Sequence, residues 1–160
     1  MIAIGLAILR LTLAAVFAIH GAHTLFGYFR GPGIGPGGLS NTAAHFSSVG
    51  LEPGVLMAVL AGVIQLIGGL LIGIGFLTRW ASSALVGYLV ILIWKEHARW
   101  GFFLNWVNDP TRGHGYEHAL VLIGGLALLA FAGAGDLSID GQRAKSAASM
   151  AAGRARLRNR

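Results

Sequence analysis

The sequence of 160 residues has no cysteine and few charged residues. Without cysteine the chain cannot form disulfides, thiolate metal sites or a cysteine nucleophile, and cysteine usage says nothing about the redox state of its compartment. Only 11% of the residues are charged and 55% are hydrophobic, with a mean hydropathy of +0.69. Soluble domains carry about 25% charged residues, so this chain has too little charge to cover a surface that faces water.

The apolar residues form four runs, which we expect to be transmembrane helices. A helix needs about 20 apolar residues to cross a hydrocarbon layer about 30 Å thick, and the runs cover residues 2–26, 53–77, 80–97 and 116–134. The second and third cannot be one helix, because it would be about twice as long as that layer is thick. The sequence therefore predicts an all-α fold, a four-transmembrane-helix bundle within residues 1–140, with Gly69 and Gly73 on a close-packing seam.

Two longer connections are expected to be loops on the same side of the bundle, residues 28–53 and 99–115. The first contains the spacing G-x-G-x-x-G at Gly33, Gly35 and Gly38. No strand precedes these glycines, which excludes the usual dinucleotide-binding motif.

The cations gather at the carboxyl end of the chain. The formal net charge is +6, no acidic residue follows Asp140, and the tail holds Arg143, Lys145, Arg154, Arg156, Arg158 and Arg160. Cytoplasmic segments of membrane proteins are enriched in Lys and Arg, and such cations bind anionic lipid. We predict a multi-pass membrane protein, with both termini and a basic tail, residues 141–160, in the cytoplasm. Nucleic acid is not an expected partner, because no recognised nucleic-acid motif accompanies the charge.

A few polar residues interrupt the apolar runs near the predicted outer side. Polar and ionisable groups inside a membrane span usually face the bundle interior or a wet cavity. The predicted topology brings one such set to the same leaflet: His20, His23, Gln65, His97 and Glu117. We expect these side chains to line a pocket with Gln65 at its floor.

This set is compatible with two kinds of chemistry. Imidazoles and a carboxylate bind transition metals, so His20, His97 and Glu117 form a candidate metal site. The same groups can bind a quinol and accept its protons, because histidine titrates near neutral pH.

Each polar residue also has a structural explanation. Glu117 is favoured at a helix start by the helix dipole, and Gln65 can form an interhelical hydrogen bond. His45 and His114 are expected in solvated loops, and one of Glu117 and its neighbour His118 is expected to face lipid headgroups. Arg10 is expected to reach the inner headgroups with its charged end.

In addition, the chain resembles the DoxX family over about residues 9–140. The segments that carry the resemblance are Leu9-Arg10-Leu11, Ile19-His20-Gly21-Ala22-His23-Thr24-Leu25-Phe26-Gly27, Phe46-Ser47-Ser48-Val49-Gly50-Leu51, residues 60–69, Gly75-Phe76-Leu77-Thr78-Arg79, His97, Gly101-Phe102-Phe103 and Gly115-Tyr116-Glu117-His118-Ala119-Leu120. The resemblance implies a four-helix inner-membrane bundle. It also implies kinship with subunits of quinol oxidases, thiosulfate–quinone oxidoreductases and redox-stress membrane complexes.

Two positions depart from the family pattern. Gln65 stands where the family often has Glu, which removes a charge that a proton relay or metal site would use. His23-Thr24 stands where a Gln-Lys pair is common, which adds an imidazole.

The functional hypothesis is a subunit of a quinone-linked membrane oxidoreductase system with an outward-facing polar pocket. The cofactor is unknown, with quinone and a transition metal both considered, and whether the chain is itself an enzyme is left open. The alternative is a non-catalytic scaffold or partner subunit of a redox-stress complex. A small transporter is the weaker third option, because the internal repeat of many transporters is not evident. The expected partners are the lipid bilayer, other membrane or redox proteins and further copies of the chain.

Overall fold

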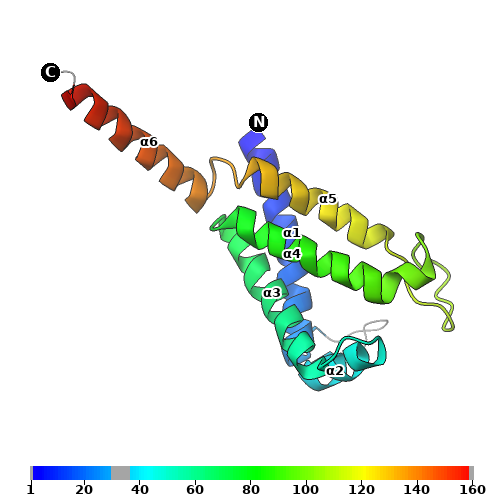
Figure 1. Cartoon of the computed structure of the whole chain (residues 1–160). Helices are drawn as coiled ribbons and strands as arrows, with labels where there is room; N and C mark the ends of the chain where they lie inside the picture. Colours follow the sequence, from blue (N-terminus) through cyan, green and yellow to red (C-terminus); the bar gives the residue numbers. More distant parts are fainter. Residues whose placement is uncertain (1, 30–36, 159–160) are drawn as a thin grey trace.

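The computed structural model describes residues 2–29 and 37–158, and within these ranges the protein is all-α, with no strand. The order of elements along the chain is α1 (Ile2–Phe26), α2 (Leu39–Ser48), α3 (Gly54–Ile74), α4 (Thr78–Leu92), the π-helix η1 (Ile93–His97), the 3-10 turn η2 (Ala98–Trp100), α5 (Glu117–Ala132) and α6 (Ile139–Arg158) (Figure 1). Gly33 and Gly35 of the glycine motif lie outside the described residues.

Helices α1 and α3 pack against each other through small residues. A Cβ at Gly21 would overlap the backbone of Leu66, and a Cβ at Gly69 would lie 2.7 Å from the backbone nitrogen of Ala18. Gly73 faces Ala14 on the same seam. The predicted close packing at Gly69 and Gly73 is thus confirmed, because small residues let two helix backbones approach closely.

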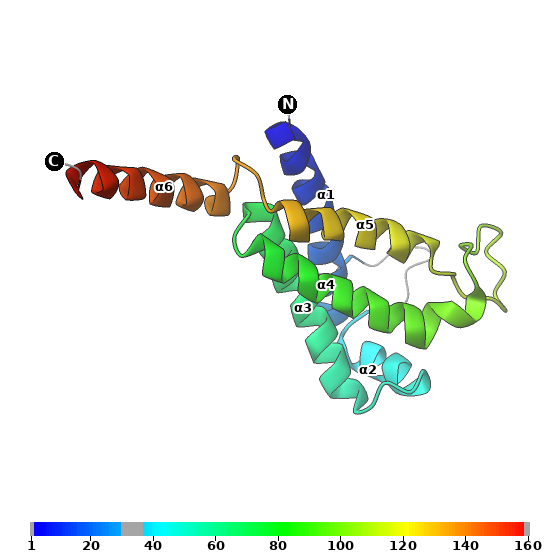
Figure 2. The same ribbon diagram turned by 45° about the horizontal axis from the view of Figure 1, so that its top comes forward.

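The four long helices of the body form two pairs that diverge. Helices α1 and α3 make one pair and α4 and α5 the other, and both views show the pairs separating away from the α3–α4 turn (Figures 1 and 2). Where they meet, a core of fully buried side chains joins them, which includes Phe17, Ile72, Leu85, Leu126 and Leu129. The short helix α2 closes the far end of the first pair and buries Phe46.

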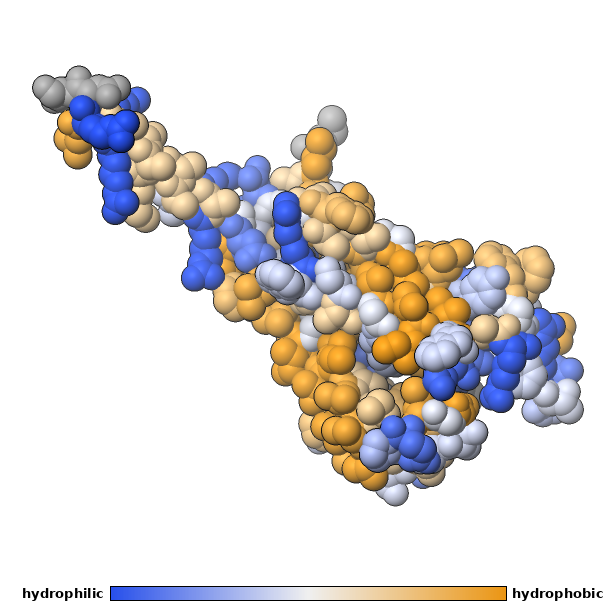
Figure 3. Space-filling view, in the orientation of Figure 1, coloured by the Kyte–Doolittle hydropathy of each residue, from blue (hydrophilic) through white to orange (hydrophobic). Residues whose placement is uncertain are grey.

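Two helices, α1 and α3, are long and apolar enough to cross a bilayer. Only 17% of the apolar window of α1 and 39% of that of α3 is buried within the protein. Large apolar side chains therefore remain uncovered, such as Leu11, Ile67 and Leu70, and orange side chains dominate the visible surface of α3 (Figure 3). Helix α5 is also apolar but has 16 residues. Lipid is the solvent that such surfaces require.

Arg10 does not extend to the headgroups as expected, because the protein itself binds its charged end. The residue is 4% exposed, and its Nη2 donates to the carbonyl oxygen of Leu137 at 2.7 Å. Leu137 belongs to the connection between α5 and α6, which contacts the amino-terminal half of α1. A buried guanidinium requires acceptors nearby, and this carbonyl supplies one.

The first turn of α6, just after this connection, also holds the start of α4. The carboxylate of Asp140 accepts hydrogen bonds from the backbone N–H groups of Leu77 at 3.1 Å and Thr78 at 2.9 Å. The Asp140 N–H donates in turn to the carbonyl of Gly75 at 2.9 Å. The first N–H groups of a helix have no partner within it, so Asp140 acts as the cap of α4 from a distant part of the sequence.

We expect Asp140→Ala to lower the free energy of unfolding in detergent by about 1–2 kcal/mol, the usual effect of losing a helix cap. Asp136→Ala is the matched control, from the connection that precedes α6. Its carboxylate pairs with Lys145 at 3.1 Å, but both side chains are exposed, and such pairs contribute about 0–1 kcal/mol. Thermal unfolding followed by tryptophan fluorescence compares the two variants, and equal losses would contradict the capping role.

Candidate functional site

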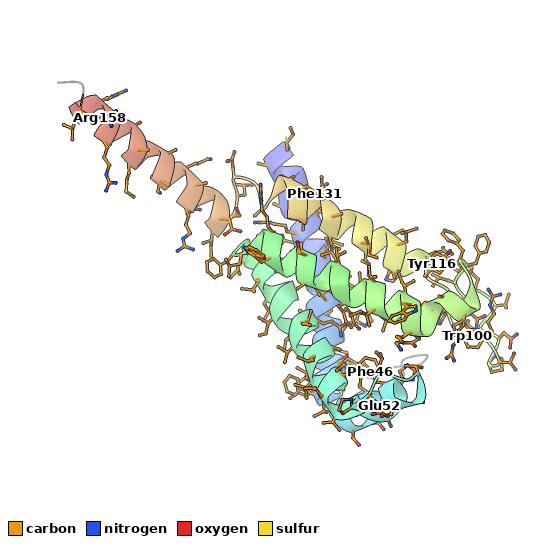
Figure 4. All side chains as sticks on the ribbon, viewed as in Figure 1. Phe46, Glu52, Trp100, Tyr116, Phe131 and Arg158 are labelled. Atoms are coloured by element: carbon orange, nitrogen blue, oxygen red, sulfur yellow. The ribbon has the colours of Figure 1, made fainter. Side chains whose placement is uncertain are left out.

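A cavity of about 550 Å³ lies between the two diverging helix pairs. Its wall comes from α1, α3, α4, η1, α5 and the loop that joins η2 to α5. The labels on Trp100 and Tyr116 mark the two ends of this loop, at the tip of the α4–α5 pair (Figure 4). Much of the lining is apolar and includes Val16, Phe17, Leu89, Leu92, Ala119 and Leu122. Ligand cavities typically have this size and this apolar character, with a few polar groups that orient the ligand.

Three of the predicted site residues line this cavity together: His20, Gln65 and His97. Gly21 contacts Leu66, and His20 and Gln65 are the residues just before these two. The contact therefore places His20 and Gln65 on one wall of the cavity. Gln65 is 5% exposed, and its Nε2 donates to the carbonyl of Ala61 within its own helix at 3.2 Å. Its hydrogen bond is therefore intrahelical, not interhelical.

The other two predicted residues, His23 and Glu117, are not part of the lining. The Nδ1–H of His23 donates to the carbonyl of Tyr28 at 2.7 Å, just beyond the end of α1. Glu117 accepts a hydrogen bond from the N–H of Leu104 at 3.1 Å. Both side chains hold the adjoining loops in place, so their contribution to the cavity is indirect.

The loop between η2 and α5 is built around the buried side chain of Asn105. Its Nδ2 donates to the carbonyls of Asp109 at 2.8 Å and Arg112 at 2.7 Å, and its Oδ1 accepts from the Asp109 N–H at 3.0 Å. These bonds place Trp106, Asn108 and His114 on the cavity wall. An asparagine that satisfies three backbone groups fixes a loop that has no regular structure.

One carboxyl in this loop is sensitive to pH. Hydrogen bonds from the hydroxyl and the N–H of Thr111 lower the pKa of Asp109, because both stabilise the ionised carboxylate. The contribution of Asp109 to loop order is thus complete above the usual carboxyl pKa of about 4. It is lost as the pH falls through the lowered pKa.

Five further polar residues of the cavity were not predicted as site residues: Tyr88, Asn105, Asn108, His114 and His118. His114 is an exposed loop residue, as expected, and its Nδ1 also accepts a hydrogen bond from the N–H of Asn105 at 3.3 Å. His118 shares one face of α5 with Leu122, which lies one helical turn later and lines the same wall. His45, also expected in a solvated loop, is exposed but lies in α2, where it pairs with Glu96 at 3.0 Å.

Hydrogen bonding fixes the proton position on two neutral rings of the cavity. His97 Nδ1 lies 2.9 Å from the carbonyl oxygen of His114, so it must donate, and the neutral ring keeps its lone pair on Nε2. His114 Nδ1 accepts from a backbone N–H, so its neutral ring carries the proton on Nε2. When neutral, these two rings therefore offer one acceptor, His97 Nε2, and one donor, His114 Nε2–H.

A metal site gains no support from this geometry. Residues 2–29 and 37–158 contain no group of three or more His, Asp or Glu side chains placed to hold a metal ion. The set of His20, His97 and Glu117 stays a prediction from the sequence, and the carboxylate in it is bonded to Leu104.

The DoxX family model matches residues 5–98, more than half of the chain. The chain belongs to the DoxX family. No curated protein and no solved structure matches it. The matched part of this DoxX protein includes His20, Gln65 and His97 and ends before the loop that carries His114 and the helix that carries His118. Family membership and the exposed apolar helices agree that this DoxX protein resides in a membrane.

We expect Gly115→Ala to disrupt the loop that bounds the cavity. A Cβ at Gly115 would overlap the carbonyl oxygens of Gly101, Phe102 and Phe103, which are backbone atoms and cannot move aside singly. Forcing extra atoms into such a contact costs about 1–3 kcal/mol, so tryptic cleavage after Arg112 should become at least about fivefold faster.

Gly124→Ala is the control for this loop variant. Gly124 lies in α5 with no atom within 4 Å of an added Cβ, and alanine favours a helix more than glycine does. Cleavage after Arg112 should match that of the unaltered protein. Equal cleavage of both variants would show that the contacts around Gly115 do not hold the loop.

Proposed function

We propose that this DoxX protein is a four-span protein of the bacterial inner membrane. Helices α1 and α3 would be the first two spans, α4 with η1 the third, and α5 the fourth, so that residues 1–140 form the membrane domain. Both termini would face the cytoplasm, because Arg79 and the cations of the tail would lie on the same side as the termini and cytoplasmic segments are enriched in Lys and Arg. The cavity would then open toward the non-cytoplasmic side.

We propose further that the cavity binds the ring of a quinone or quinol. The observation that carries this proposal is one apolar cavity whose wall combines His20, Gln65, His97 and His114. A quinone offers a flat apolar ring with two carbonyl acceptors, and a quinol offers two hydroxyl donors. The neutral His114 Nε2–H suits a quinone carbonyl, and the neutral His97 Nε2 suits a quinol hydroxyl.

In this function the protein would be the quinone-binding subunit of a membrane redox system. The Nε2 lone pair of His97 can accept a proton from a quinol hydroxyl. Electrons would pass to a partner protein. A scaffold role is the alternative, and it is favoured by the loop residues Phe103, Trp106 and Val107, which are exposed beside the cavity.

Trp106 provides an internal reporter for a binding test, because it lines the cavity and quinones quench indole fluorescence. Titration of the detergent-purified protein with a short-chain quinone should quench its fluorescence to saturation. His20→Ala should raise the Kd about tenfold, as expected for one lost hydrogen bond to a ligand.

His23→Ala is the matched control, because His23 lies three residues further along α1 and does not line the cavity. Its Kd should equal that of the unaltered protein, and Trp106→Phe should remove most of the saturable quenching. Absence of saturable quenching, or equal effects of His20→Ala and His23→Ala, would refute the quinone site. The scaffold role would then be favoured if this protein captures a redox protein in stoichiometric amount and if the capture persists when the histidines are replaced.

A further inference from the structure

Helix α6 extends from the body of the protein without a neighbour along most of its length. Both ribbon views show it projecting sideways from the end of the molecule that holds the start of α1 and the α3–α4 turn (Figures 1 and 2). Residues 142–158 are all exposed. A helix that contacts so little of its own protein needs another surface to determine where it lies.

The three large aliphatic and thioether side chains of α6 lie on one stripe, defined here as Ile139, Met150 and Leu157. Their spacings of 11 and 7 residues correspond to about three and about two helical turns, so they project from the same side. Met150 is 66% exposed and Leu157 is 76% exposed. The opposite side consists of small residues such as Ala148 and Ala155.

Cations accompany this stripe. Arg143 and Arg154 lie close beside it on the helical projection, and Lys145, Arg156 and Arg158 lie further around the helix. Blue cationic side chains stand out from the pale small residues of α6 (Figure 3). Large apolar side chains with adjacent Lys and Arg favour binding of a helix at the interface of an anionic membrane.

The root of α6 fixes which side of the helix faces the body. The guanidinium of Arg143 lies 5.3 Å from the centre of the Phe76 ring, in the α3–α4 turn. Arg143 is adjacent to the stripe, so the stripe faces the same way as this contact. Phe76 follows the end of α3, whose side chains Leu70 and Ile74 are exposed. The stripe therefore faces the end of α3, where the exposed apolar surface of that helix stops.

From these observations we infer that α6 lies along an anionic bilayer surface, with Ile139, Met150 and Leu157 between the acyl chains and its cations on lipid phosphates. Charge complementarity selects anionic lipid, because beyond Asp140 the helix carries five cations and no acid. Each cation near such a surface strengthens binding about fivefold. The inference rests on the membrane placement of α1 and α3 and is independent of what the cavity binds.

Single spin labels test the inference in the full-length protein, since the chain has no cysteine of its own. Met150→Cys and Leu157→Cys place labels on the stripe, and Ala148→Cys and Ala155→Cys place labels with the same spacing on the opposite side. The protein is reconstituted in phosphatidylcholine vesicles with or without phosphatidylglycerol. Collision with oxygen reports immersion in lipid, and collision with a water-soluble nickel complex reports exposure to water.

In vesicles with phosphatidylglycerol, we expect the labels at 150 and 157 to favour oxygen and those at 148 and 155 to favour nickel. In phosphatidylcholine alone, all four should be more accessible to nickel. A reference label at Ile67→Cys, on the exposed side of α3, should favour oxygen in both lipids. If the reference label favours nickel, the membrane placement of α3 is wrong, and the inference for α6 is refuted with it.

Two matched double variants separate the effect of the apolar stripe on membrane binding from the effect of the net charge. With a label at Ser146→Cys, on the stripe side, Met150→Gln with Leu157→Gln should reduce immersion. Ala148→Gln with Ala155→Gln makes the same substitutions on the opposite side and should leave immersion unchanged. Neither pair alters the net charge, so equal effects of the two pairs would overturn the stripe.

Three other outcomes would also overturn the inference. The four labels could show no difference between the sides of α6 or between the lipids. Duplex DNA could protect the labels where lipid does not, which would assign the cations to nucleic acid. Spin–spin broadening at position 150 in both lipids would instead assign the stripe to a second copy of the chain.

Discussion

The close approach of α1 and α3 is the contact on which the rest of this DoxX protein depends. Gly21 meets the backbone of Leu66, and Gly69 meets that of Ala18, so the two helices are held in one register by places where no side chain fits. This register sets His20 beside Gln65 on the cavity wall. In lipid, where burial of apolar surface between helices gains little, such close backbone packing is a main source of helix association.

The second pair of helices is joined to the first mainly at one end, although the pair His45–Glu96 also links α2 to η1 at the other end. At the main junction, Asp140 caps α4, Arg10 binds the carbonyl of Leu137, and a buried apolar core lies beside them. Polar groups that are cut off from water need protein partners. These contacts therefore also fix the position of the first turn of α6. Away from this junction α4 and α5 diverge from α1 and α3, and the cavity is the space between the two pairs.

The cavity combines rigid and loop-borne parts. His20 and Gln65 are held by the α1–α3 contact, whereas His97 and His114 are linked to each other and to the loop organised by Asn105. The helices thus supply the apolar wall and the floor, and the loop determines which ring nitrogens can donate and which can accept. Loops on a rigid scaffold commonly carry the groups that select a ligand.

The apolar runs, the glycine seam and the basic tail were predictable, because hydropathy and small-residue spacing are local properties of the sequence. His20, Gln65 and His97 were predictable as cavity residues because polar groups are rare in such runs. The roles of Arg10, His23, Glu117 and His114 were not, since each depends on a carbonyl or N–H group from another segment. The sequence by itself determined the helices and the membrane environment. Only the tertiary structure decided which polar side chains face the cavity, because that depends on which distant backbone groups they meet.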